Sequence, residues 1–292
     1  MPKVLSYLSL SWVVMVPTTN ADNIDLKHAA SVVGVESVRL FLQDKAPSIL
    51  GSAGAQNNRK SRIDAVRTWA LEYIEALPNF VCTQHDQSFL RYGPADWQKR
   101  REIVARLQFI SGRESYKTIS VNGKPSREPY VRVATGQGHF GSVLHAMFRR
   151  RHRARFVHSG DGFTRGRPVD VFKVVHPKGY ELFIGVKREG KPKKQVRVGY
   201  EGEIHVDKSS PAVVRIVFHR LFGIPSNFPI QQGTLKIDYD SLKIGENYYW
   251  LPVERTSTAS GKHDSRRASM QTKTHTTWGN YKRFTVETEL TF

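Results

Sequence analysis

The hydrophobic and polar residues of segment 195–207 alternate almost without interruption. The charged side chains fall on one face and the apolar ones on the other, and the apolar set is Val196, Val198, Tyr200, Ile204 and Val206. Because successive side chains of an extended chain point to opposite faces, this pattern predicts one long antiparallel strand with one apolar face. Gly202 is a position where such a strand can bend.

A second strand carries the same apolar face back. The composition of 208–211, Lys-Ser-Ser-Pro, is typical of a turn, and alternation resumes with Ala212, Val214, Ile216 and Phe218. Further short strands follow one another with turns between them, which favours an antiparallel meander over alternating strands and helices. These predicted strands are 103–110, 115–121, 169–175, 182–186, 235–239, 248–254 and 281–292.

The clearest helix is predicted at 61–77, where apolar residues recur at steps of three and four. Ser61 is a suitable N-cap and Pro78 ends the run; the stripe is Ile63, Val66, Ala70, Tyr73, Ile74 and Leu77. A shorter helix is predicted near 140–150. A single apolar stripe has to pack on an apolar partner, and the sheet supplies one. The expected fold is therefore mainly β with flanking helices (α+β), a curved antiparallel sheet or incomplete β-barrel wrapped around a helix.

The first residues resemble a secretory signal. A short basic start is followed by an apolar run at 4–16 and by Thr19-Asn20-Ala21, with small residues suited to cleavage. We expect a signal peptide at 1–21, a weakly ordered segment and linker at 22–60 with a short helix near 25–43, and a single β-rich domain at 61–292. A buried N-terminal strand is the alternative for the first segment.

An exported protein is what such a signal implies, either periplasmic or otherwise secreted. The apolar run is too short to span a bilayer, so no transmembrane segment is expected in the mature chain. Cys82 is the only cysteine, which excludes an internal disulfide and a lipid-attachment cysteine at the cleavage position.

The net charge of +19 and the pI near 10.1 indicate anionic partners. Nucleic acid is an unlikely partner, because no aromatic RNA-binding strand or helix-turn-helix pattern accompanies the charge. Clusters of basic residues could attract an anionic headgroup or could form an ordinary solvated surface. The candidate anion-attracting residues are Arg149, Arg150, Arg151, Lys191, Lys193 and Lys194.

Motifs for catalysis are absent or incomplete. The segment 136–143 fits G-x-G-x-x-G, but neither the βαβ units of a dinucleotide fold nor the lysine of a kinase follows, so we interpret it as a turn into a helix. The histidines lack metal-binding spacing. Glu201 and Glu203 share the polar, solvent-facing side of the long strand, and no sequence feature there indicates a cleft. We therefore expect no catalytic residues, no cofactor and no metal.

Several segments resemble known families. The segments 71–84, 138–144, 200–207, 249–253 and 278–284 look like those of a group of uncharacterised exported bacterial proteins. The hairpin at 203–216 is similar to hairpins of the LolA/LppX/RseB-like superfamily, which includes outer-membrane lipoprotein-sorting proteins. That resemblance implies an incomplete β-barrel around a helix, with acyl chains held in the concavity. No ligand-binding residue of that superfamily matches a position here.

Pattern, charge and resemblance together predict a non-enzymatic cell-envelope protein that binds a lipid-like or amphiphilic anion in the concave face of the sheet. The candidate apolar lining is Tyr200, Ile204, Val206, Val214, Ile216 and Phe218. Whether these side chains line an open cavity or fill a core stays open at this point. The alternative is an envelope protein-interaction module, without a small-molecule ligand, that docks through strand edges or basic loops.

Overall fold

The computed structural model describes residues 8–13, 53–127, 140–149, 154–177, 183–188, 194–263 and 266–284. Strands make up most of this part of the chain, with helices α2 (Ala53–Ala76) and α3 (Ser142–Phe148). The strands are β1 (Leu8–Val13), β2 (Phe80–Tyr92), β3 (Gln98–Ile110), β4 (Arg113–Val121), β5 (Lys124–Pro125), β6 (Arg155–Thr164), β7 (Arg167–His176), β8 (Phe183–Arg188), β9 (Lys194–Arg197), β10 (Gly199–Asp207), β11 (Val213–Phe222), β12 (Ile230–Ile244), β13 (Asn247–His263) and β14 (Arg266–Arg283).

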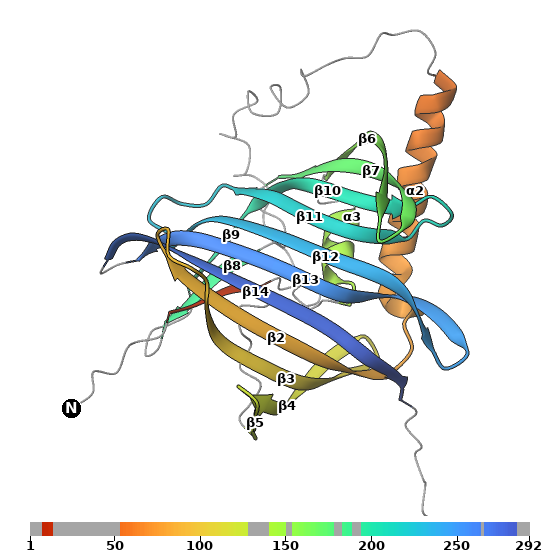
Figure 1. Cartoon of the computed structure of the whole chain (residues 1–292). Helices are drawn as coiled ribbons and strands as arrows, with labels where there is room; N and C mark the ends of the chain where they lie inside the picture. Colours follow the sequence, from red (N-terminus) through yellow and green to blue (C-terminus); the bar gives the residue numbers. More distant parts are fainter. Residues whose placement is uncertain are drawn as a thin grey trace, which may run out of the picture.

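Eleven of the strands form one antiparallel sheet in the order β5-β4-β3-β2-β14-β13-β12-β11-β10-β7-β6 (Figure 1). The first long strand, β2, pairs with the last, β14, so hairpins from both parts of the chain join into one meander. The sheet curves strongly, but its two edge strands, β5 and β6, do not pair with each other. The predicted mainly β fold with an incomplete barrel is confirmed.

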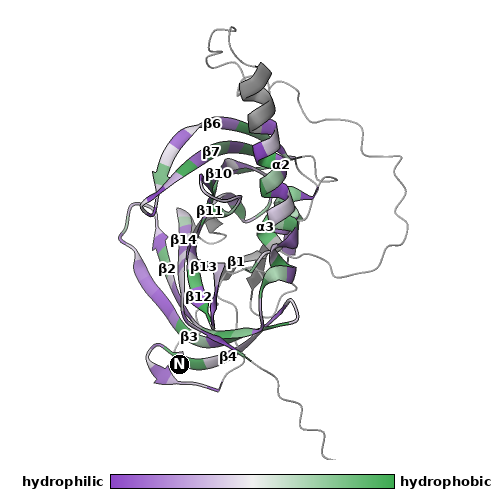
Figure 2. Cartoon of the chain, turned by 90° about the vertical axis from the view of Figure 1, so that its right-hand side faces the viewer, coloured by the Kyte–Doolittle hydropathy of each residue, from purple (hydrophilic) through white to green (hydrophobic). Residues whose placement is uncertain are grey.

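The concave side of the sheet faces the two helices (Figure 2). The apolar stripe of α2 packs into the largest hydrophobic cluster, where Val66, Ala70 and Tyr73 are buried against residues of β7, β10, β11 and β12. Tyr73 also donates a hydrogen bond of 2.5 Å from its hydroxyl to the backbone oxygen of Trp250. The amphipathic stripe thus docks on the sheet, as its spacing predicts.

Helix α2 begins at Ala53, well before the predicted N-cap Ser61. The residues at 53–60 are small or polar, so they carry no apolar stripe that could reveal a helix in the sequence. The helix thus includes the last residues of the segment 22–60, for which a linker was predicted. The short helix predicted near 25–43 lies outside the described residues.

The single strand predicted at 195–207 is also wrong, because it divides at Val198. Residues 194–197 form β9, which pairs with β8 in a three-stranded sheet of order β1-β8-β9, whereas β10 belongs to the large sheet. At Gly199, the first residue of β10, a Cβ atom would lie 2.3 Å from the ring of Phe222 and 2.8 Å from the backbone oxygen of His176, so this close approach requires glycine. Gly202 is a second irregularity, since the register of β10 against β11 shifts beside it.

Strand β1 consists of residues inside the predicted signal segment, and it pairs antiparallel with β8. A strand was the alternative to the signal peptide for this part of the sequence. The signal peptide stays a prediction, as do the domain bounds. The predicted strand at 281–292 is described only as far as Arg283, where β14 ends.

Candidate functional site

A cleft of about 440 Å³ opens between α2, α3 and the start of β6. Its size is in the range of small-molecule sites, roughly 300–1,000 Å³. Its walls combine apolar side chains with charged ones. The lining residues are Lys60, Asp64, Arg67, Met147, Phe148, Arg149, Ala154 and Phe156.

The floor of the cleft is apolar. Met147 and Phe148, from α3, are buried in the large hydrophobic cluster, and Phe156 of β6 and Ala154, which precedes β6, pack against that cluster. The rings of Phe148 and Phe156 stack with their centroids 4.9 Å apart and their planes 5° from parallel. Two neighbouring elements of the sequence are thus joined at the floor, where Met147 and Phe148 are each 1% exposed or less and Phe156 is partly buried.

The rim of the cleft is basic. Lys60, Asp64 and Arg67 lie at i, i+4 and i+7, which places them on one face of α2. Arg67 donates from Nη1 to the carboxylate of Asp64. Its Nε is shielded from solvent and finds no acceptor among the described residues. With Arg149 at the end of α3, three cations and one carboxylate surround the apolar floor, so the rim carries a net positive charge.

The six residues predicted to line the concavity are all buried, each with 4% or less of its surface exposed. Five of them, Tyr200, Ile204, Val206, Ile216 and Phe218, belong to the cluster that receives α2 and α3. Val214 is buried as well, but a register shift between His205 and Val206 brings Val213 opposite Val206 in its place. At this end of the sheet the concave face is a filled core, and contact with a ligand stays a prediction.

The predicted basic residues are only partly described. Arg149 lies at the cleft, whereas Lys194 is exposed on β9 in the small sheet. Arg150, Arg151, Lys191 and Lys193 lie outside the described residues. The structure therefore brings one of the two described members of this set to the cleft, together with Lys60 and Arg67.

Lys60 and Arg67 were missed by the sequence reasoning, although a signal for them exists. Once a helix extends through residue 60, the i, i+4, i+7 spacing places Lys60, Asp64 and Arg67 on one face. Starting the helix at Ser61 left Lys60 in a linker. The contribution of Phe156 has no local signal, because it depends on how β6 lies against α3.

A polar belt crosses the core face of the sheet on three neighbouring strands. It consists of Gln84, Asp86, Arg255, Ser257, Thr274 and Thr276, all buried. Asp86 accepts hydrogen bonds of 2.6 Å from Thr276 and 2.8 Å from Gln84, which in turn accepts one of 2.8 Å from Trp278. Sequence reasoning missed the belt too, but polar residues at apolar positions of a strand were a visible signal.

Glu201 and Glu203 are each paired with cations rather than with each other. Arg220 donates to Glu201 over 3.0 Å, and His205 contacts Glu203 at 3.0 Å. Burial works against ionisation of Glu203, but hydrogen bonds from His205 and His219 prevail, and the pKa of its carboxyl is lowered. Glu203 is therefore held as a carboxylate and is not prepared to act as a general acid.

Cys82 is buried among aromatic side chains at the other end of the sheet. Burial raises the pKa of its thiol far above the usual range, and nearby Glu114 adds to the shift. A thiol that stays protonated is a poor nucleophile, so Cys82 acts as a small apolar core residue.

No family model matches the chain, and no curated protein is significantly similar to it. Three solved structures have a related arrangement. A domain described as an outer-membrane lipoprotein-sorting protein, from Vibrio parahaemolyticus, shares 12% identity over 78% of this chain and 95% of its own, with a TM-score of 0.37. A DUF1329 family protein from Desulfovibrio piger shares 11% identity over 76% of this chain and 93% of its own, with a TM-score of 0.31.

A LolA superfamily protein from Nitrosomonas europaea shares 9% identity over 77% of this chain and 94% of its own, with a TM-score of 0.26. Two of these structures are described by names from the lipoprotein-sorting and LolA group. A likeness this distant carries no information about a ligand or an activity. In the described part of the chain, neither helix combines the length and the apolar character that a bilayer crossing requires.

Proposed function

We propose that this protein is a non-enzymatic component of the cell envelope that binds an amphiphile with an anionic headgroup in the cleft between α2, α3 and β6. One observation carries the proposal: an apolar floor of Met147, Phe148 and Phe156 lies directly beneath a basic rim. An amphiphile presents the matching pair of surfaces, a hydrocarbon chain and a charged head.

The floor supplies affinity without specific hydrogen bonds. Burial of a hydrocarbon chain contributes about 0.8 kcal/mol per methylene, before the cost of ordering the chain. Phe148 and Met147 belong to the same cluster as the predicted lining residues Tyr200, Ile204 and Ile216. Those side chains belong to the filled core, so a longer chain would contact them by displacing the side chains of the floor, and this is the role we propose for them.

The rim supplies selection by charge. Arg67 offers the buried Nε donor, and an oxygen of a phosphate, sulfate or carboxylate head would satisfy it, which relieves an unpaired buried donor that costs about 1–3 kcal/mol. Lys60 and Arg149 add positive charge on either side of it. Arg150, Arg151, Lys191 and Lys193 would attract the headgroup at longer range, whereas Lys194 lies exposed in the small sheet and is given no role here.

A displacement titration tests this site. A dansyl-labelled fatty acid bound to the protein should be displaced by an alkyl phosphate or alkyl sulfate and not by an alkyl trimethylammonium of the same length. Arg67→Gln with Lys60→Gln should weaken binding by about tenfold or more, the effect of losing roughly 1.4 kcal/mol. Ala154→Phe, which fills the cleft from its wall, should weaken binding without any change of charge.

Lys117→Gln with Lys194→Gln is the matched control, because it removes two charges, as the cleft double variant does, from exposed positions on β4 and β9. Its affinity should stay close to that of the wild type. Equal displacement by anionic and cationic amphiphiles, or equal loss in the control and in the cleft variants, would contradict the proposal.

A second candidate function, a protein-interaction module, is favoured by β6. This strand is the end of the large sheet, and among the described strands it pairs only with β7. Phe163, on the same strand, has 79% of its surface exposed. An extended segment of another envelope protein could add to such an edge through its backbone hydrogen bonds. A protein with this function alone would bind no dansyl-labelled fatty acid in the titration above.

A further inference from the structure

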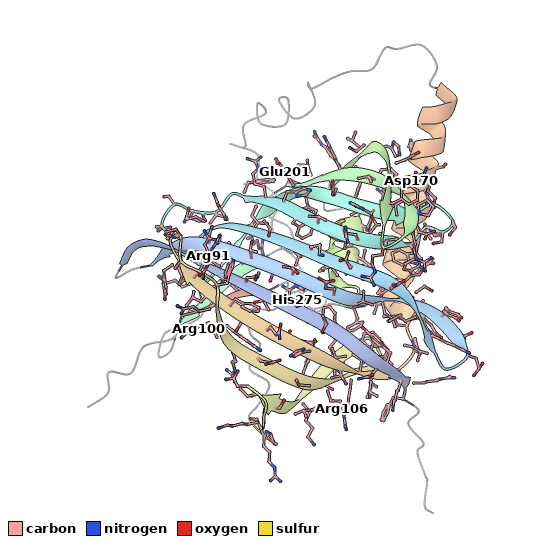
Figure 3. All side chains as sticks on the ribbon, in the orientation of Figure 1. Arg91, Arg100, Arg106, Asp170, Glu201 and His275 are labelled. Atoms are coloured by element: carbon pink, nitrogen blue, oxygen red, sulfur yellow. The ribbon has the colours of Figure 1, made fainter. Side chains whose placement is uncertain are left out.

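Three side chains that can bind metal meet on β6 and β7, close to the first turns of α2. His158, Asp161 and Asp170 bring one ring nitrogen and two carboxylate oxygens within 4.8 Å of one another, the one such group in the described residues. His158 Nε2 lies 3.9 Å from Asp161 Oδ1 and 3.7 Å from Asp170 Oδ1. Asp170 is on the side of the sheet next to α2 (Figure 3).

The pairing of the two strands creates this cluster. Asp161 and Asp170 are directly opposite each other in the register. In a regular strand, His158 and Asp161 would point to opposite faces because their spacing is odd. A register shift between His158 and Gly160 inserts one extra residue and returns both side chains to the same face. Gly160 has a φ of 141°, which a residue with a side chain rarely adopts.

Outer partners orient both carboxylates. Lys208 Nζ lies 2.7 Å from Asp161 Oδ2, and Arg62 Nε donates to Asp170 Oδ2 over 3.0 Å. Each carboxylate therefore uses Oδ2 for a cation and keeps Oδ1 on the side of His158. Arg62 is itself held, because Nη2 donates to the backbone oxygen of Ser210 over 3.0 Å. Such outer contacts are what fixes the ligands of metal sites.

The imidazole is positioned by packing. The His158 ring stands nearly perpendicular to that of Phe172, at 76°, with 5.2 Å between their centroids. The side chain of His158 is 17% exposed and that of Asp161 is 65% exposed, so an ion can enter from solvent. The cluster combines an oriented ligand set with an open approach.

We propose that His158, Asp161 and Asp170 form a binding site for a divalent transition metal, with Zn²⁺ as the preferred ion. Ligand atoms about 2.0–2.1 Å from a tetrahedral Zn²⁺ are about 3.4 Å apart, so the two histidine–carboxylate distances have to close by only about 0.3–0.5 Å. An imidazole among the ligands favours Zn²⁺ over Mg²⁺ and Ca²⁺, which take oxygen ligands. Water would occupy the fourth position.

Lys208 and Arg62 also set a limit on the affinity. Their charges offset those of the two carboxylates, and they repel an incoming cation. We therefore expect the site to bind Zn²⁺ in the micromolar range and to bind it more tightly when Lys208 is replaced by glutamine. A simple network of ion pairs gives the opposite expectation, because loss of Lys208 would then only remove a favourable contact.

The test is a calorimetric titration of the untagged full chain with Zn²⁺, alongside the visible absorption of Co²⁺ as a signature of the ligand set. The wild type should bind one ion per chain and give the Co²⁺ bands of a tetrahedral site. His158→Gln and Asp161→Asn should each weaken binding by about tenfold or more, and Lys208→Gln should strengthen it several-fold. His275→Gln is the control, because it removes another histidine–carboxylate contact, with Glu254 at 3.2 Å.

The proposal is overturned if the wild type binds no Zn²⁺ at millimolar concentration, if Asp161→Asn binds as the wild type does, or if Lys208→Gln binds more weakly. Asp161→Asn serves as the decisive variant, since the exposed position of Asp161 keeps its replacement from disturbing the fold. None of these outcomes depends on the amphiphile, so the experiment tests the metal site independently of the proposed function.

Discussion

Single residues on the outer face of the sheet show how a strongly basic chain still stabilises its carboxylates. The side chain of Asp238 on β12 has 1% of its surface exposed, beneath Arg215 and Lys236. Lys236 Nζ lies 3.1 Å away, and Arg215 donates from Nε to the same carboxylate. Burial alone would raise the pKa of Asp238, but these hydrogen bonds outweigh it and the pKa is lowered.

Asp238→Asn should destabilise the protein by about 3 kcal/mol near neutral pH, because it leaves two cations without their buried partner. The folded pKa lies below the unfolded value of about 3.9, so the stabilisation is present above that pH and is lost as the pH falls through the folded pKa. Urea unfolding should therefore show a gap between variant and wild type that closes in acid.

Glu246→Gln is the control for this experiment, since Glu246 is exposed and lies 3.6 Å from Lys243. It should change the free energy of unfolding by less than about 0.5 kcal/mol. A gap for Asp238→Asn that stays constant from neutral pH to pH values well below 3.9, or one as small as that of the control, would contradict the account.

At the scale of elements, the close contact between the two helices depends on one glycine. Gly141 precedes α3 and has a φ of 111°, and a Cβ atom there would lie 2.3 Å from Cγ1 of Ile74. This contact sets how closely α3 approaches α2, and with it the position of the cleft floor. The glycine-rich segment of the sequence thus serves packing at this position, and its residues 136–139 lie outside the described chain.

Gly141→Ala should destabilise the protein by about 2–3 kcal/mol, the sum of a strained φ and a clash with α2. Gly245→Ala separates the two effects, because Gly245 has a φ of 63° and a Cβ there would meet only the side chain of Arg283 at 3.5 Å. It should cost about 1 kcal/mol. Equal losses in thermal or urea unfolding would show that the helix contact contributes nothing.

Elements could be predicted where periodicity and burial coincide. The apolar stripe of α2 has a helical period and is the part that packs on the sheet. The first turns of α2 are polar and carry no such stripe, so the sequence did not reveal where the helix begins. The break at Val198 was missed because apolar alternation continues on both sides of it, while the pairing partner changes from β8 to β7 and β11. The alternation of apolar and polar residues shows which face of a strand is buried, but it does not show with which strand it pairs.

At the scale of the molecule, the sequence indicated a curved one-sided sheet and a basic charge, but not where the two would meet. The cleft unites Lys60 and Arg67 of α2 with Phe148 of α3 and Phe156 of β6, and only the docking of the helices brings them together. The cluster of His158, Asp161 and Asp170 needs a register shift beside Gly160, and a glycine alone does not reveal which side chains such a shift brings together. Sites assembled from distant elements depend on this tertiary pairing.

The whole-molecule account makes one central claim, that the cleft binds an anionic amphiphile. Native mass spectrometry of the protein purified from its native cells tests it most directly, with Ala154→Phe prepared in the same way and Lys194→Gln as the control. We predict an adduct with the mass of an anionic lipid on the wild type and on Lys194→Gln, and its loss from Ala154→Phe. An adduct-free wild type, or an adduct that Ala154→Phe retains in full, would contradict the claim.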